Sequence, residues 1–226
     1  MSMKKFENYK QAEDYLLRSV IEEPHFITSS TYEKFGTGFI LLNPLENKND
    51  RSNYTYAEEF FNWLLSGEKE LSSELLELNP WVKRFVDSTN LPENFSSSYG
   101  WKIRNQLADI FDELDTNLES RRAYMNILLP EDSIIRTTKT THEYPCTIGL
   151  HFFVRYDRLH LMVNMRSNNI YSVMPYDVYN FTKLQQNVAR VQGIGLGWYY
   201  HGINSAHVFK GDMRRWKEKT AMENQC

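Results

Sequence analysis

The chain has 226 residues, enough for one sizeable α/β or α+β domain with its own hydrophobic core. Hydrophobic residues make up 41% of the chain and charged residues 24%, which is ordinary for a globular protein. The formal net charge of −3 provides no basic field that would hold nucleic acid. No apolar run reaches the roughly 18 residues of a membrane span. We therefore expect neither direct nucleic-acid binding nor a membrane segment.

The opening residues 1–17 mix charged and apolar side chains and do not resemble a secretory signal, so a cytoplasmic location is expected. The chain has two cysteines, Cys146 and Cys226, which do not suggest a disulfide framework. A single internal cysteine is usually a small buried hydrophobe, but it can also be a nucleophile. Both interpretations of Cys146 stay open on composition alone.

Apolar spacing predicts a mixture of helices and strands in a chain that has no internal repeat and no domain linker. Helices are expected at residues 8–22, 56–65, 103–114 and 176–191. Strands are expected at residues 38–43, 124–129, 147–156, 159–165, 198–203 and 205–209. Since only Asp157 and Arg158 separate two of these strands, a tight hairpin is predicted there. Residues 1–226 are therefore predicted to form a single domain.

Glycine, proline and serine mark the connections between these elements. Gly67 is predicted to end the second helix. Residues 46–53, and a region containing Pro80, Pro92 and serines 96–98, are predicted to be loops. The basic stretch 214–219 is predicted to be a solvated helix face.

Polar residues at the ends of the predicted elements are the candidates for chemistry, although each is ambiguous alone. Asp177 can be an ordinary residue of the first helical turn, and Arg166 can be a surface or salt-bridged arginine. His207 can be a hydrogen-bonded structural residue. The candidates are Cys146, Arg166, Ser167, Asp177, His207 and the Arg121–Arg122 pair, which would otherwise be a solvated turn.

The order of these residues resembles the thymidylate synthases, and especially the T-even phage deoxycytidylate hydroxymethylases. Residues 145–169 read PCTIGLHFFVRYDRLHLMVNMRSNN: a cysteine, a hairpin and then Arg-Ser. The families continue with an Asn or Asp in the next helix and later a His-x-Tyr motif. Matching segments are Tyr99-Gly100-Trp101, Ser120-Arg121-Arg122, Pro175-Tyr176-Asp177, His207-Val208-Phe209 and, weakly, the phosphate-loop echo Gly36-Thr37-Gly38. The resemblance covers roughly residues 32–210.

The resemblance implies an α+β fold: a mixed β-sheet packed with helices, with one sheet face forming the interface of a homodimer. It implies that Cys146 adds to C6 of a pyrimidine nucleoside monophosphate, so that C5 accepts a one-carbon group from 5,10-methylenetetrahydrofolate. It also implies a set of substrate-binding residues. These are Arg166 and Ser167 on the 5′-phosphate, Arg121 and Arg122 reaching the same phosphate from the second subunit, and His207, Asn169 and Tyr99.

The residue at position 177 indicates which pyrimidine base is bound. Thymidylate synthases have Asn at this position, where its amide matches uracil, and the phage hydroxymethylases have Asp. Cytosine presents an N4 donor and an N3 acceptor, and a protonated carboxyl group can satisfy both. Asp177 therefore favours a cytosine nucleotide, (d)CMP, over a uracil nucleotide.

The sequence also departs from the families on the folate and proton-relay side. The families have a helix glutamate three residues before a Trp; counting back from Trp63, Glu59 is one residue off and Glu58 two. One residue is about a 100° rotation on a helix, so Glu59 fills the role only if the helix is bulged or shifted. Asn169 replaces an Asp that contacts the folate pterin, and Phe209 replaces the Tyr.

Two further differences concern the flanks of the motifs. Only 17 residues follow Phe209, so the longer tail that closes over folate is expected to be absent. Thr147 follows the cysteine, as in the phage hydroxymethylases. Two hypotheses remain: a C5 hydroxymethylating enzyme, with or without folate, and a degenerate homologue that binds a nucleotide or a partner protein without turnover.

Overall fold

The computed structural model describes residues 3–82, 98–133 and 144–223. Within these residues an eight-stranded sheet has the order β1-β3-β8-β6-β5-β4, with β2 paired to β3 and β7 to β8. The strands are β1 (Lys5–Phe6), β2 (Phe26–Ile27), β3 (Thr31–Leu41), β4 (Tyr124–Asn126), β5 (Thr147–Arg155), β6 (Arg158–Met165), β7 (Asn168–Asn169) and β8 (Gly195–Phe209). The helices are α1 (Tyr9–Glu22), α2 (Tyr54–Ser66), α3 (Ser73–Leu78), the 3₁₀ turn η1 (Pro80–Val82), α5 (Tyr99–Ile103), α6 (Gln106–Thr116), α8 (Met174–Val191) and α9 (Lys210–Glu223).

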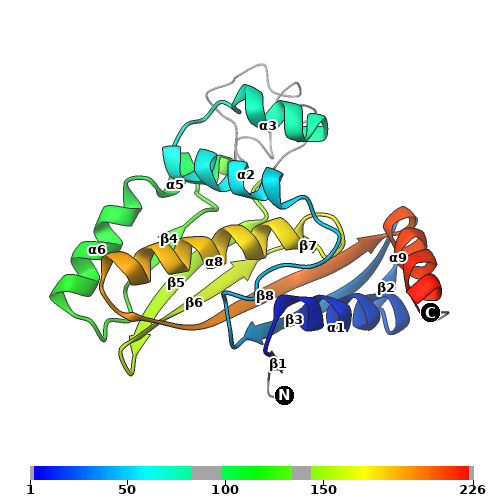
Figure 1. Ribbon diagram of the computed structural model, residues 1–226, viewed down its shortest axis with the longest axis horizontal. Helices are drawn as coiled ribbons and strands as arrows, with labels where there is room; N and C mark the ends of the chain where they lie inside the picture. The colour runs from blue at the N-terminus through cyan, green and yellow to red at the C-terminus, as the bar shows by residue number, and fades with distance from the viewer. Residues whose placement is uncertain (1–2, 83–97, 134–143, 224–226) are drawn as a thin grey trace.

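The sheet is mixed, which confirms the predicted α+β class. β8 runs antiparallel to β3 and parallel to β6. Helices α1 and α8 lie along the same side of the sheet, and α2 packs on α8 (Figure 1). None of the helices in the described ranges is long and apolar enough to cross a membrane.

The core lies between α8 and the sheet. On α8 the buried residues Val178, Phe181, Leu184 and Val188 recur every three or four positions, which gives one apolar face. Alternate side chains of β5 and β6 point into this core, and the residues between them face the other side of the sheet. On that other side Phe153 and its neighbours are only partly buried.

The predicted hairpin is confirmed with its turn moved by one residue. The turn residues are Tyr156 and Asp157, with φ of 53° and 56°, and not Asp157 and Arg158. Two consecutive positive φ values are typical of the type I′ turn, whose twist matches that of the flanking strands. An Asp is tolerated in this conformation, whereas the exposed Tyr156 was not a turn signal.

Four strand predictions were wrong in extent, because pairing between strands overrides the local sequence pattern. The strand predicted at 38–43 is β3, which begins at Thr31, since its polar first half pairs with β8. The two strands predicted at 198–203 and 205–209 are one continuous strand, β8. The strand predicted at 124–129 is paired only as far as Asn126.

The helix predictions were closer. The helices predicted at 8–22, 56–65 and 176–191 are α1, α2 and α8, and Gly67 ends α2 in the left-handed conformation, as expected. The helix predicted at 103–114 is instead split into α5 and α6. Helix α9 contains the basic stretch 214–219. Of the predicted loop region, Pro80 begins η1, and Pro92 and serines 96 and 97 lie outside the described residues, as does Cys226.

Helix α5 is held against α2 by a close backbone contact at Gly100. A Cβ built on Gly100 would lie 2.0 Å from the backbone oxygen of Leu64, a distance that no packing tolerates. Gly100 directly follows Tyr99, so this contact also constrains the backbone from which the Tyr99 side chain extends.

We predict that Gly100→Ala lowers the free energy of unfolding by about 1–3 kcal/mol or more, because α5 must move away from α2. The matched control is Gly211→Ala in α9, where an added Cβ meets nothing within 4 Å. That variant should leave stability unchanged or raise it by up to ~1 kcal/mol. Urea unfolding followed by circular dichroism measures both, and equal effects of the two substitutions would contradict the packing argument.

Candidate active site

Cys146 lies immediately before β5 and is partly buried. Its backbone N–H donates to the hydroxyl oxygen of Tyr99 at 3.1 Å, and the N–H of Thr147 donates to the same oxygen at 3.3 Å. The Tyr99 ring stacks on Phe181 of α8, with ring centroids 6.4 Å apart. Tyr99 therefore anchors the backbone that presents the Cys146 thiol.

Arg166 follows the end of β6 and holds the Cys146 segment from the other side. Its Nε donates to the Pro145 carbonyl at 2.7 Å, and its Nη2 donates to the Tyr144 carbonyl at 2.8 Å. The same Nη2 lies 3.7 Å from Cys146 Sγ. A guanidinium group beside a sulfur atom stabilises the thiolate form, which is the nucleophilic form of cysteine. Nη1 makes no hydrogen bond within the described residues and can meet an anion.

Ser167 contacts His207 across the β7–β8 junction. Ser167 Oγ and His207 Nδ1 are 3.3 Å apart. Burial lowers the pKa of His207, so the imidazole is neutral at neutral pH and has one donor and one acceptor nitrogen. Phe209 packs edge-on against the His207 ring with centroids 5.4 Å apart. The sequence predicts Ser167 and His207 as separate candidates, and the structure brings them together.

Asn168 holds Asp177, at the first turn of α8. The Asn168 Nδ2 donates to Asp177 Oδ2 at 2.7 Å. Burial raises the pKa of Asp177 to about 7, although the hydrogen bond from Asn168 acts in the opposite direction. Near neutral pH the carboxyl group is therefore part neutral and part ionised. Sequence reasoning missed Asn168; a polar residue between Ser167 and Asn169 was the one available signal.

Asn169 is engaged in local structure. Its Oδ1 accepts the backbone N–H groups of Tyr171 and Ser172, both at 3.1 Å, and its Nδ2 donates to Ser172 Oγ at 3.1 Å. This is the pattern of an Asx turn, which here directs the chain from β7 towards α8. The position predicted to face a pterin thus has an amide whose oxygen is already occupied.

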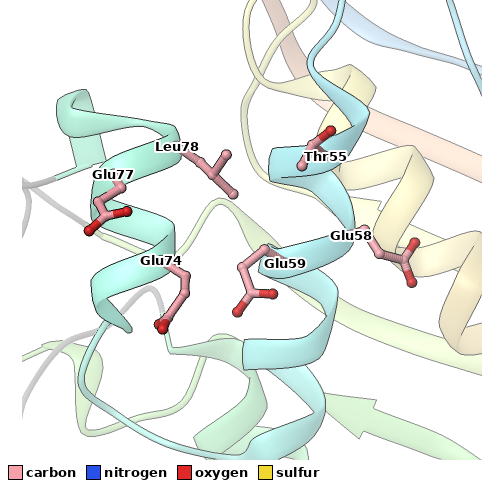
Figure 2. Close-up of a pocket in the computed structure, with 6 residues that line it drawn as sticks. All are labelled: Thr55, Glu58, Glu59, Glu74, Glu77 and Leu78. Carbon is pink, nitrogen blue, oxygen red and sulfur yellow. The ribbon is translucent and has the colours of Figure 1, made fainter.

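The helix glutamates of α2 point in two directions (Figure 2). Glu59 faces α3 across a pocket also lined by Glu74 and Glu77, and its described hydrogen bond comes from Asn62 Nδ2 at 3.3 Å. Glu58 points to α8, where it accepts a hydrogen bond from Tyr179 and pairs with Lys183 Nζ at 3.0 Å. Among the described contacts, neither glutamate touches the residues around Cys146.

Arg121 and Arg122 lie on the surface before β4 and touch none of the residues around Cys146 among the contacts described for this chain. Arg122 Nη2 pairs with Glu113 at 3.1 Å. The Arg121 carbonyl lies 2.9 Å from His151 Nε2, and His151 is on the face of the sheet opposite α8. The pair therefore lies next to the sheet face that the helices leave open.

The Gly36-Thr37-Gly38 segment lies inside β3 and pairs with β8. Gly36 has φ +64°, and a Cβ on Gly38 would lie 2.2 Å from the backbone oxygen of His201. These glycines therefore allow a local twist and a close strand approach, and the described segment is a strand rather than an open loop.

Comparisons with known proteins agree with this arrangement. The family model described as thymidylate synthase matches residues 50–225. The chain is 35% identical over 198 residues to the thymidylate synthase of Haloferax volcanii, an alignment that covers 77% of this chain and 56% of that protein. It is 27% identical over 149 residues to thymidylate synthase 1 of Bacillus spizizenii, covering 61% and 52%. A putative thymidylate synthase of Methanococcoides burtonii is 28% identical over 168 residues, covering 68% and 75%.

The chain therefore belongs to the thymidylate synthase family. It spans about half the length of the first curated relatives that it matches. The segments that surround Cys146, Arg166 and Asp177 all fall within the matched residues 50–225.

We predict that Asp177→Asn changes how stability depends on pH. Because the folded protein raises the Asp177 pKa from 3.8 to about 7, it binds this proton more tightly than the unfolded chain does. The free energy of unfolding contributed by Asp177 therefore falls as pH rises from about 4 to about 7, by up to ~4 kcal/mol. Asn cannot titrate, so the variant should lack this loss.

The measurement is urea unfolding of the wild type and of Asp177→Asn across this pH range. The difference between their free energies of unfolding is taken at each pH. The difference is needed because burial lowers the pKa of His201 to about 3, which makes stability change in the opposite direction with pH. A difference that does not vary with pH would contradict a raised pKa for Asp177.

Proposed function

We propose that the protein is a pyrimidine nucleotide C5 one-carbon transferase, in which the Cys146 thiolate adds to C6 of a cytidine monophosphate, (d)CMP, and hydroxymethylation follows at C5. One observation carries the proposal. The consecutive residues Arg166, Ser167 and Asn168 contact Cys146, His207 and Asp177 respectively. A nucleophile, a phosphate-binding cation and a base-reading carboxyl group are thus connected through one short segment.

The first chemical step follows from the Cys146 environment. The thiolate forms a bond to C6, and the electron pair of the C5–C6 double bond moves towards C5 and the ring substituent at C4. C5 then takes an electrophile or a solvent proton. When C5 subsequently loses a proton, the electron pair re-forms the double bond and expels the Cys146 thiolate. Without an added electrophile this cycle exchanges H5 with solvent.

The donor proposed from the resemblance is 5,10-methylenetetrahydrofolate, which would supply a one-carbon unit to C5. At the position that faces pterin in the family, Asn169 does not fit this role, because its side-chain oxygen accepts two backbone N–H groups. We therefore assign no residue of this chain a role in binding the folate donor or in transferring its one-carbon group. The proposed activity rests on the nucleotide side of the site.

The cytosine assignment is supported by the environment of Asp177. A desolvated carboxyl group with a pKa of about 7 is protonated often enough near neutral pH to act as donor and acceptor together. Cytosine needs both at N3 and N4. Glu59, the other residue proposed for catalysis, would have to act from the far side of α2, so we give proton transfer at C5 no protein residue.

A homodimer is supported by the open face of the sheet. Partly buried residues such as Phe153 and Met162 line that face, and the exposed Arg121–Arg122 pair lies beside it. In a twofold dimer the same patch meets itself, so each pair of arginines can reach the neighbouring subunit. We propose that they complete the phosphate site there with Arg166 and Ser167 of the partner chain.

The second candidate is a homologue that binds a pyrimidine nucleotide or a partner protein without turnover. The direction of Glu59 favours it, because the proton-relay glutamate of the family has no described counterpart beside Cys146. The two candidates differ in one observable: an enzyme exchanges H5 through Cys146, whereas a binding protein does not.

We predict that the protein exchanges H5 of CMP or dCMP in deuterated water, and that Cys146→Ala lowers the rate on the order of 10³-fold or more because no thiolate can add to C6. Proton NMR follows the H5 signal, with UMP and dUMP run in parallel. Cys226→Ala is the matched control, since Cys226 is the other cysteine of the chain, and it should exchange at the wild-type rate.

Exchange that survives Cys146→Ala would contradict the assignment of the nucleophile. Binding of a nucleotide with no exchange for any of the four would favour the binding protein. Binding is measured separately by calorimetry, so that the two failures are distinguished.

We also predict that Cys146→Ala and Arg121→Ala complement each other. Each variant alone should be nearly inactive. After the two are mixed and allowed to exchange subunits, each hybrid dimer has one intact site, so about a quarter of the wild-type exchange activity should return. Mixtures that stay inactive, although mass spectrometry detects the hybrid dimer, would show that Arg121 acts within its own subunit. Full activity of Arg121→Ala alone would show that Arg121 does not act at the site.

A further inference from the structure

A buried chain of hydrogen bonds continues from Asp177 into the core. The Tyr199 hydroxyl lies 2.6 Å from His201 Nδ1, His201 Nε2 lies 2.9 Å from Asn168 Oδ1, and Asn168 Nδ2 lies 2.7 Å from Asp177 Oδ2. Tyr199 and His201 are 0% exposed and Asn168 is 1% exposed. Tyr199 and His201 are two residues apart on β8, so their side chains point to the same face of the sheet. Helix α8, which carries Asp177, covers this face.

The direction of this chain follows from its inner end. The Tyr199 hydroxyl is fully buried, and His201 is its hydrogen-bond partner among the described residues. A buried O–H without an acceptor is costly, so Tyr199 donates to Nδ1 of His201. Burial lowers the pKa of His201 to about 3, so the ring is neutral and has one N–H, which must then be on Nε2.

The same direction continues to the carboxyl group. The Nε2–H of His201 donates to the Asn168 oxygen, which leaves the Asn168 NH₂ to donate to Asp177 Oδ2. The reverse direction would leave the Tyr199 O–H without an acceptor. Stacking of the Phe39 and His201 rings, with centroids 5.5 Å apart, keeps the imidazole in this orientation.

A neutral carboxyl group held in this way is no longer symmetric. Oδ2 is committed as an acceptor, so the acidic proton lies on Oδ1, which makes no hydrogen bond within the described residues. An unrestrained carboxylic acid can put its proton on either oxygen and match either cytosine or uracil. With the order fixed, a cytosine N4–H donates to Oδ2 and cytosine N3 accepts the Oδ1 proton. Uracil in the same pose places its O4 acceptor against the acceptor Oδ2 and its N3–H donor against the Oδ1 proton.

We propose that Asn168, oriented by His201 and Tyr199, is a positioning residue that fixes the order of donor and acceptor on Asp177 and so makes the site select cytosine over uracil. The proposal rests on the proposed function, because C6 addition and phosphate binding hold both bases in one pose. It adds three residues that touch neither the nucleophile nor, in this assignment, the substrate.

The test compares Tyr199→Phe with Tyr200→Phe. Tyr199→Phe removes only the hydroxyl that sets the direction of the chain and keeps the buried ring. Tyr200→Phe removes a hydroxyl from the adjacent residue of β8, which points to the other face of the sheet. The measured quantity is the ratio of H5 exchange rates for CMP and UMP. Tyr199→Phe should lower this ratio by about tenfold or more, and Tyr200→Phe should not change it.

Asn168→Ala serves as a second variant and should lower the ratio at least as much, with folding checked by circular dichroism. Long-range ¹H–¹⁵N NMR of the nucleotide-free protein gives an independent readout, with the His201 signals assigned by their loss in His201→Phe. The proposal expects the Nε2–H tautomer in the wild type and a mixture of tautomers in Tyr199→Phe.

A wild-type Nδ1–H tautomer would overturn the proposal even if the enzyme turns over. A ratio unchanged in folded Tyr199→Phe and Asn168→Ala would also overturn it, and would leave the proposed function intact. If the wild type neither binds nor exchanges any nucleotide while His201 is the Nε2–H tautomer, the proposed function fails, and the selectivity assigned to Asn168 fails with it.

Discussion

A single hydrogen bond from the buried amide of Asn168 to the partly exposed carboxyl group of Asp177 constrains the rest of the site. Desolvation raises the pKa of Asp177 to about 7 against the opposing effect of this hydrogen bond, but desolvation does not decide which carboxyl oxygen carries the proton. The amide of Asn168 gives that carboxyl group a direction. Because His201 and Tyr199 are fully buried on β8, the amide cannot reorient without leaving a polar group unsatisfied.

The segment from Arg166 to Asn168 connects the chemistry to the fold. It follows the end of β6, where a strand of the central sheet gives way to the short strand β7. Arg166 turns to the Cys146 segment before β5, and Asn168 turns to α8. A shift of β6 relative to β5 would therefore change the position of the nucleophile and of the base-reading group together. The Gly100 contact supports the Cys146 segment from α5 through Tyr99.

Much of this arrangement was predictable from the sequence, since helices α1, α2 and α8 and the hairpin have strong periodicity and turn chemistry. The family resemblance identified Cys146, Arg166, Ser167, Asp177 and His207, but roles at these positions remain proposals. Sequence could not give the continuous strand β8 or the early start of β3, because partner strands stabilise their polar residues. It also could not give Asn168 and His201, since a buried polar network is defined by which side chains meet across elements. The direction of the Glu59 side chain was not predictable either, because each residue along a helix turns the side-chain direction by about 100°.

The most direct test of the account is the ratio of CMP to UMP H5 exchange measured by NMR from about pH 5 to pH 9. Formation of the Cys146 thiolate affects both substrates equally, so the ratio isolates the protonation of Asp177. The account predicts a ratio that favours CMP at low pH and falls as pH rises through about 7, with no such fall in Asp177→Asn. A ratio that stays constant through this range, or favours UMP throughout, would contradict it.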